Sequence, residues 1–142
     1  WTVSIDGNTW FYAKFVTDEP INENTDTLVS ATTYGFYDAD DTCIGYAQEQ
    51  AVKGEGGDYY ICYMDADGNP KDYYSNQKAT QTYDSEGNLI ATGNVDFNGF
   101  FESQHCYVEI TAEEDSTMQM DFMDKMAMYL YLFSDFNSEH LD

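Results

Sequence analysis

Apolar and polar residues alternate with period two in many short runs of this chain, and Asp, Asn and Gly separate one run from the next. A strand with one face in a core and the other in solvent requires this alternation, because successive side chains point to opposite faces. The separating residues tolerate the tight turns of hairpins. The pattern therefore predicts an all-β domain of antiparallel, hairpin-linked strands.

Nine runs have the length of a strand. They are Trp10–Val16, Thr27–Tyr37, Cys43–Gln50, Asp58–Met64, Lys78–Tyr83, Leu89–Asp96, Gln104–Thr111, Thr117–Phe122 and Met126–Phe133. Strands of this number and length predict an antiparallel up-and-down barrel or sandwich of about eight to nine strands. Because the chain has only 142 residues, we expect a single domain over residues 1–142.

The segment 117–136 has two interpretations. Apolar and polar residues alternate strictly from Thr117 to Phe122, and the run Met126–Phe133 that follows is continuously apolar. We favour a hairpin, with the turn at Met123-Asp124-Lys125. The alternative is that the apolar run forms a buried helix, because a fully apolar segment fits either structure.

Three expected turns echo one another, each with an Asp directly after an aromatic or Met residue: Tyr37-Asp38, Met64-Asp65 and Tyr83-Asp84. Hairpins share so much turn chemistry that such echoes arise without duplication, so we infer no internal repeat.

One of these turns also resembles a calcium loop. Asp65, Asp67 and Asn69 occupy alternating positions as in an EF-hand, but Pro70 and Asn76 stand where that loop requires Gly and a bidentate Glu. We therefore expect solvated turns, and neither a metal site nor a cofactor.

The balance of charge limits the possible partners. Twenty-seven acidic residues face five Lys, with no Arg, and the formal net charge is -22. Such a surface repels nucleic-acid phosphates and anionic membranes, and without Arg it has no bidentate donor for phosphate. Since 42% of the residues are hydrophobic and 17% aromatic, the chain is nevertheless too apolar for a disordered acidic tail.

Three cysteines, Cys43, Cys62 and Cys106, allow at most one disulfide within the chain, and the spacing leaves its partners open. Cys62 lies in an apolar run and is expected to be a small buried residue. The pair His105-Cys106 is no nucleophile with its base, because neighbours on a strand face opposite sides. No other catalytic motif is present, so we expect a protein that is not an enzyme.

The first residue is Trp1, and no apolar run has membrane-spanning length. We interpret this start as the result of removing an upstream segment, and we expect an extracellular or cell-surface location.

Two features resemble bacterial lipocalin-like, or calycin-type, barrels: an early strand with Gly7-Asn8-Thr9-Trp10, and a late strand Tyr107–Thr111 followed by an acidic turn. This resemblance implies an antiparallel barrel that can hold one small apolar ligand. If the late apolar run is a helix, the chain instead resembles the tubby-like and LURP-one-related fold, as the segment Thr82–Ala91 suggests. That fold wraps an antiparallel barrel around a helix.

Three functions are compatible with these features. The leading hypothesis is an exported, non-enzymatic binding domain for a small apolar ligand, lined by Met, Phe and Tyr. A carbohydrate-binding module is the second, with Tyr59-Tyr60, Tyr73-Tyr74 and Trp10 as the available aromatic residues. The third is an acidic protein that inhibits a basic partner by DNA mimicry. The oligomeric state is left open.

Overall fold

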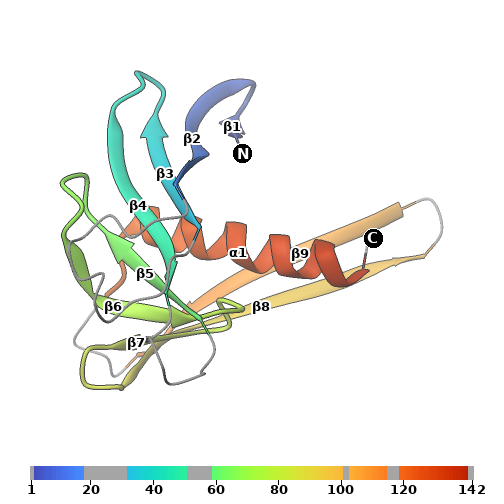
Figure 1. The fold of residues 1–142 in the computed structure, drawn as a ribbon. Helices are drawn as coiled ribbons and strands as arrows, with labels where there is room; N and C mark the ends of the chain where they lie inside the picture. The colour runs from blue at the N-terminus through green and yellow to red at the C-terminus, as the bar shows by residue number, and fades with distance from the viewer. Residues whose placement is uncertain (1, 18–31, 51–58, 101–102, 115–118, 141–142) are drawn as a thin grey trace. The chain divides into compact units, whose positions relative to one another are not determined.

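A computed structural model gives the fold for residues 2–17, 32–50, 59–100, 103–114 and 119–140 (Figure 1). Nine strands and one helix occur in these residues. The strands lie in one sheet in chain order, so that each strand neighbours the next one in the sequence. β1 and β9 are the edges of this sheet, which does not close on itself in the described residues.

The strands are β1 (Thr2–Ile5), β2 (Asn8–Thr17), β3 (Thr33–Asp38), β4 (Cys43–Gln50), β5 (Tyr60–Met64), β6 (Pro70–Asn76), β7 (Gln81–Asp84), β8 (Leu89–Phe100) and β9 (Ser103–Ala112), and the helix is α1 (Phe122–His140). Pairing is antiparallel from β1 to β5 and from β7 to β9. The predicted all-β class, with consecutive strands running up and down, is confirmed.

The chain divides into two compact units, Trp1–Tyr74 and Ser75–Asp142. In the first unit, one face of the sheet is closed to solvent by the side chains of Phe11, Ala13, Phe36, Ala47 and Tyr63. The register explains this, because Ala13 pairs with Phe36, and Ala47 with Tyr63, across neighbouring strands. Burial alternates on β2, where Phe11 and Ala13 are buried, whereas β5 is buried on both faces from Ile61 to Met64.

In the second unit, α1 packs on β8 and β9 (Figure 1). The helix begins after Asp121, whose carbonyl accepts the N–H groups of Asp124 and Lys125 at 3.0 and 3.1 Å. Ala127, Met128 and Leu132 are buried. Their spacing of one and four residues places them on one side of the helix.

A glycine on β8 makes this packing possible. A Cβ atom on Gly93 would lie 2.7 Å from Leu132 Cδ1, 3.0 Å from Met128 Cε and 2.6 Å from the carbonyl oxygen of Ala79. The helix side chains thus occupy the space that any other residue at position 93 would need.

The expected hairpin over 117–136 is wrong, and the helical alternative is confirmed. Residues Phe122–His140 are helical, including all of Met126–Phe133, and the described residues 119–121 are in no strand. Thr117 lies outside the described residues. Apolar residues occur on every side of this segment, so a period of two and a helical period both fit it. The two family resemblances stay predictions.

Two strands were missed by the sequence analysis, β1 and β6. β1 has only four residues, and β6 begins at Pro70, a residue type that is rare inside strands. The buried positions of β6 are Tyr73 and Ser75, and a buried serine hides the alternation. The predicted strand Cys43–Gln50 is confirmed at both ends.

The remaining predicted strands shift at their ends. β7 begins at Gln81 instead of Lys78, because Asn76 closes a loop in which Ala79 has a φ of 58°. The side-chain oxygen of Asn76 accepts the N–H of Thr80 at 2.8 Å. The first residues of the predicted strands Thr27–Tyr37 and Asp58–Met64 lie outside the described residues.

The described cysteines occupy neighbouring strands. Cys43 is half-buried and Cys62 is buried, as expected for Cys62, and neither belongs to a disulfide in the described residues. The side chains of His105 and Cys106 lie outside the described set. Among the described helical residues, no helix has the length and apolar character needed to cross a membrane.

Candidate functional site

Tyrosine and lysine side chains share one partly exposed face of the first unit. The register places Tyr12 opposite Tyr37 and Lys14 opposite Gly35, and Gly35 opposite Tyr46 on the next strand. Lys14 is exposed, and the three tyrosines are half-buried. We call Tyr12, Lys14, Tyr37 and Tyr46 the tyrosine face.

The rings of the tyrosine face are held by one another. Tyr12 and Tyr37 stack with their ring centroids 5.3 Å apart and their planes 19° from parallel. The Lys14 ammonium lies 4.4 Å from the centroid of Tyr37, a cation–π contact. A Cβ atom on Gly35 would lie 2.9 Å from Tyr37 Cε2, so the glycine allows this ring to lie against the backbone. The face is therefore arranged before any ligand arrives.

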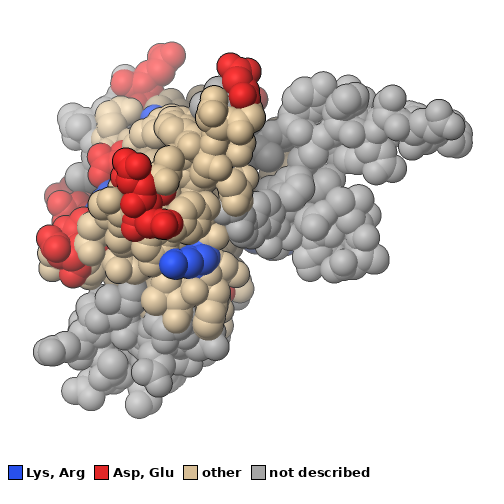
Figure 2. Space-filling model, turned by 90° about the horizontal axis from the view of Figure 1, so that it is seen from above, with Lys and Arg blue, Asp and Glu red and all other residues tan. Residues whose placement is uncertain are grey.

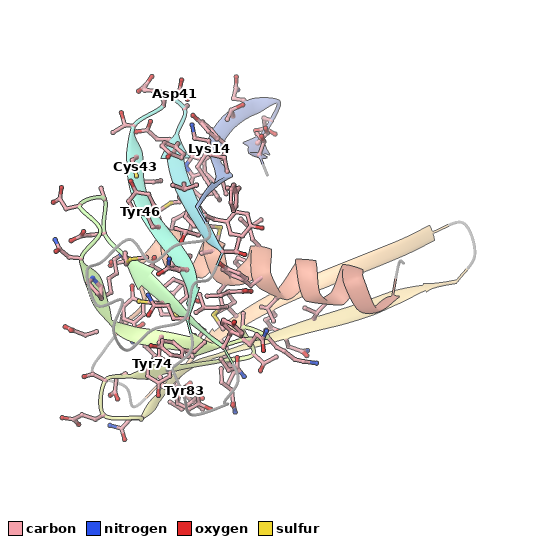
Figure 3. The ribbon with its side chains drawn as sticks, viewed as in Figure 1. Lys14, Asp41, Cys43, Tyr46, Tyr74 and Tyr83 are labelled. Carbon is pink, nitrogen blue, oxygen red and sulfur yellow. The ribbon has the colours of Figure 1, made fainter. Side chains whose placement is uncertain are left out.

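A carboxylate from the β3–β4 hairpin adjoins the face. The Tyr12 hydroxyl donates a hydrogen bond to Asp41 Oδ1. Figure 3 shows Asp41 at the tip of this hairpin, Lys14 on β2, and Cys43 and Tyr46 further along β4. The face thus combines aromatic rings, phenolic hydroxyls, one ammonium and one carboxylate.

A bulge brings Cys43 to the same face as Tyr46. Phe36 pairs with Gly45 and Tyr37 with Cys43, so Ile44 is the extra residue in β4. Without it, residues three apart on a strand would point to opposite faces. The hydrogen bond with the Cys43 thiol, followed by burial, raises the pKa of Tyr46 to about 12.

A buried chain of hydrogen bonds continues across the strands of the same unit. Tyr60 donates to Gln50 Oε1 at 3.3 Å, Gln50 Nε2 to Gln48 Oε1 at 2.6 Å, and Gln48 Nε2 to Thr33 Oγ1 at 2.6 Å. We call these four residues the amide ladder. Burial raises the pKa of Tyr60 and keeps it a donor. Gln48 and Thr33 are completely inaccessible to solvent, so the ladder fixes the register of β3, β4 and β5.

The predicted calcium-like turn uses its carboxylate on its own backbone. Asp65 Oδ1 accepts the N–H groups of Asp67 at 3.0 Å and Asn69 at 2.9 Å. These bonds lower the pKa of Asp65 below its ordinary value, and the bond from Asn69 has the largest effect. No group of three or more His, Cys, Asp or Glu residues suited to a metal ion occurs in the described part of the chain.

The aromatic residues expected to bind carbohydrate are not members of the tyrosine face. Tyr73 is buried and Tyr74 half-buried, and Tyr74 contacts Tyr60 edge-on at 5.7 Å. Tyr59 is half-buried. Trp10 is the extra residue of a bulge against β1, and it is 41% exposed with its ring edge-on to Phe11.

The sequence analysis missed Tyr12, Tyr37 and Tyr46 as functional candidates. They are far apart in the sequence, and only strand register brings them together. The spacing of Tyr12 and Lys14, two residues apart on one strand, was the available signal.

The described acidic side chains do not merge into one patch on the surface shown in Figure 2. The red groups there are separated by tan surface, and some lie beside blue Lys side chains. DNA mimicry requires carboxylates gathered on one face, so this view does not favour it.

Comparison with protein-family models, with curated proteins and with solved structures finds no match for this chain. The assignment of a function therefore depends on the chemistry of the tyrosine face.

Proposed function

We propose that the protein is a non-enzymatic, exported or cell-surface binding domain, and that its tyrosine face binds carbohydrate. The stacked pair of Tyr12 and Tyr37, both half-buried, carries this proposal. Aromatic rings offer apolar area for the C–H faces of a sugar, and phenolic hydroxyls offer hydrogen bonds at their rim.

The polar groups around the rings match the same ligand class. The Lys14 ammonium and the Asp41 carboxylate provide a donor and an acceptor beside the stack. Sugar hydroxyls both donate and accept hydrogen bonds, so they can use both groups at once. Because the rings are already fixed by stacking and by the space at Gly35, binding costs little ordering of side chains.

A small apolar ligand, our leading hypothesis from the sequence, finds less support in the described residues. An adaptable pocket was expected to be lined by Met, Phe and Tyr. Met64 and Met128, two of the six Met, are completely inaccessible to solvent and belong to the packed interiors of their units. This function stays a prediction, as does export from the cell.

The test is a glycan array followed by calorimetry with the best neutral oligosaccharide. We expect Tyr37→Ala to weaken binding at least tenfold, because it removes both the ring and the partner of Tyr12. Silence of the wild-type protein on the array would contradict the proposal.

Tyr83→Ala is the matched control. Tyr83 is also half-buried and its hydroxyl also makes a side-chain hydrogen bond, to Gln81 Oε1 at 2.5 Å, but it belongs to the second unit. We expect this variant to bind like the wild type. Equal losses in the two variants would show that the tyrosine face is not the binding site.

A further inference from the structure

Three hairpin loops of this chain have the same construction. In each loop an Asp accepts, through Oδ1, the N–H groups of the residues two and four positions later, at 2.9 to 3.0 Å. The loops are Asp38–Thr42, Asp65–Asn69 and Asp84–Asn88. In all three, the fourth residue donates its N–H to the carbonyl of the first Asp.

The fourth residue of each loop has a positive φ, but only one of the three is not a glycine. Gly68 and Gly87 have φ values of 84° and 86°, and Asp41 has a φ of 64°. A residue with a Cβ atom is strained in this region, although Asp tolerates it better than most. Since glycine closes the two other loops with the same backbone bonds, loop closure does not explain Asp41.

The side chain of Asp41 instead serves a residue far away in the sequence. Its Oδ1 accepts the hydroxyl of Tyr12 on β2, and Tyr12 stacks on Tyr37. The bond uses one of the two carboxylate oxygens, and Asp41 is exposed. A strained residue whose side chain bonds to a distant residue of a binding surface points to a role at that surface.

We infer that Asp41 is the residue that sets the specificity of the tyrosine face, selecting neutral, hydroxyl-rich sugars over acidic ones. The Tyr12 hydroxyl donates its hydrogen bond to the Asp41 carboxylate, so the Tyr12 oxygen can act toward a ligand as an acceptor. The carboxylate itself accepts further hydrogen bonds from ligand hydroxyls. The same charge repels uronic, sialic and sulfated sugars, and Asp38 and Asp40 in this loop add to the repulsion. This inference rests on the proposed carbohydrate function.

The test compares Asp41→Gly and Asp41→Asn with the wild-type protein. Binding is measured by calorimetry with a neutral glucose oligosaccharide and with a glucuronate oligosaccharide of the same length. We expect Asp41→Gly to weaken binding of the neutral sugar about tenfold and to remove most of the preference over the acidic sugar. Because glycine relieves the positive φ, the melting temperature of this variant stays the same or rises.

Asp41→Asn keeps an acceptor oxygen and tolerates the same φ, but it has no charge. We expect it to retain most of the neutral-sugar affinity and to lose the discrimination against the acidic sugar. Gly87→Asp is the reciprocal control, since it places the strained residue in the loop of the second unit. It lowers the melting temperature and leaves binding unchanged.

The results separate this inference from the proposed function. If the wild type binds no sugar, both are overturned. If the wild type binds, Tyr37→Ala loses binding, and both Asp41 variants keep the affinity and preference of the wild type, the tyrosine face is the site and only the inference about Asp41 is overturned.

Discussion

The two compact units stabilise their interiors in different ways. In the first unit the amide ladder places four polar side chains across three strands, with Gln48 and Thr33 completely buried. In the second unit α1 presses Met128 and Leu132 into the space left by Gly93. A hydrogen-bonded interior depends on every partner being present, whereas a close-packed interior depends on volume. The two units should therefore fail under different substitutions.

The largest loss of stability is expected at Gly93, where the close packing of the second unit leaves no volume for a side chain. We expect Gly93→Ala to lower the free energy of unfolding by about 3 kcal/mol, because its Cβ would meet a backbone oxygen at 2.6 Å that cannot rotate away. Urea unfolding followed by circular dichroism measures this loss.

Gly87→Ala is the control for the glycine itself. A Cβ atom there meets nothing within 4 Å, but the φ is +86°, so the cost is the backbone strain of about 1–2 kcal/mol. A smaller loss for Gly93→Ala than for Gly87→Ala would refute the close approach of Ala79 and α1 to Gly93.

The next effect tests the hydrogen-bonded interior. Gln48→Leu has a similar volume but removes the middle of the amide ladder, so Gln50 Nε2 and Thr33 Oγ1 each lose their Gln48 partner. We expect a loss of about 2 kcal/mol in the free energy of unfolding, measured in urea, because buried polar groups left without a partner are costly.

The same substitution at an exposed glutamine provides the control. Gln81 is exposed on β7, and Gln81→Leu is expected to change the stability by less than about 0.5 kcal/mol. If Gln48→Leu is as mild as Gln81→Leu, the ladder does not stabilise the first unit.

These two interiors differ in how far the sequence reveals them. The sequence pattern predicted β4 from Cys43 to Gln50, and both ends are confirmed. It could not show that Gln48 and Gln50 are inside, since polar residues in a strand are expected to face solvent. In α1, Met126–Phe133 is apolar on every side, so the period that distinguishes a helix from a strand is absent.

The candidate site was harder to predict than the fold. Tyr12, Tyr37 and Tyr46 meet through the register of three strands and a bulge at Ile44, and no local pattern encodes a bulge. The repeated Asp turns were visible in the sequence. The sequence does not show that Asp41 has a positive φ of 64°, at the position where the two other loops have Gly68 and Gly87.

The smallest effect concerns a feature that the two units share, a hairpin loop whose first Asp accepts backbone N–H groups of the same loop. Hydrogen bonds from Asn69 and Asn88, more than other causes, lower the pKa values of Asp65 and Asp84 below the ordinary 3.8. A carboxyl with a lowered folded pKa stabilises the fold above its unfolded pKa, and this contribution is lost as the pH falls through the folded pKa. Acid should therefore weaken one loop in each unit below about pH 4.

The double variant Asp65→Asn/Asp84→Asn tests this point, because asparagine keeps the acceptor oxygen but does not titrate. We expect its melting temperature to fall less than that of the wild type between pH 5 and about pH 2. Asp72→Asn, an exposed carboxyl on β6, should follow the wild type. If all three proteins lose the same amount, the loops do not contribute to acid sensitivity, and the resemblance between the units is one of geometry alone.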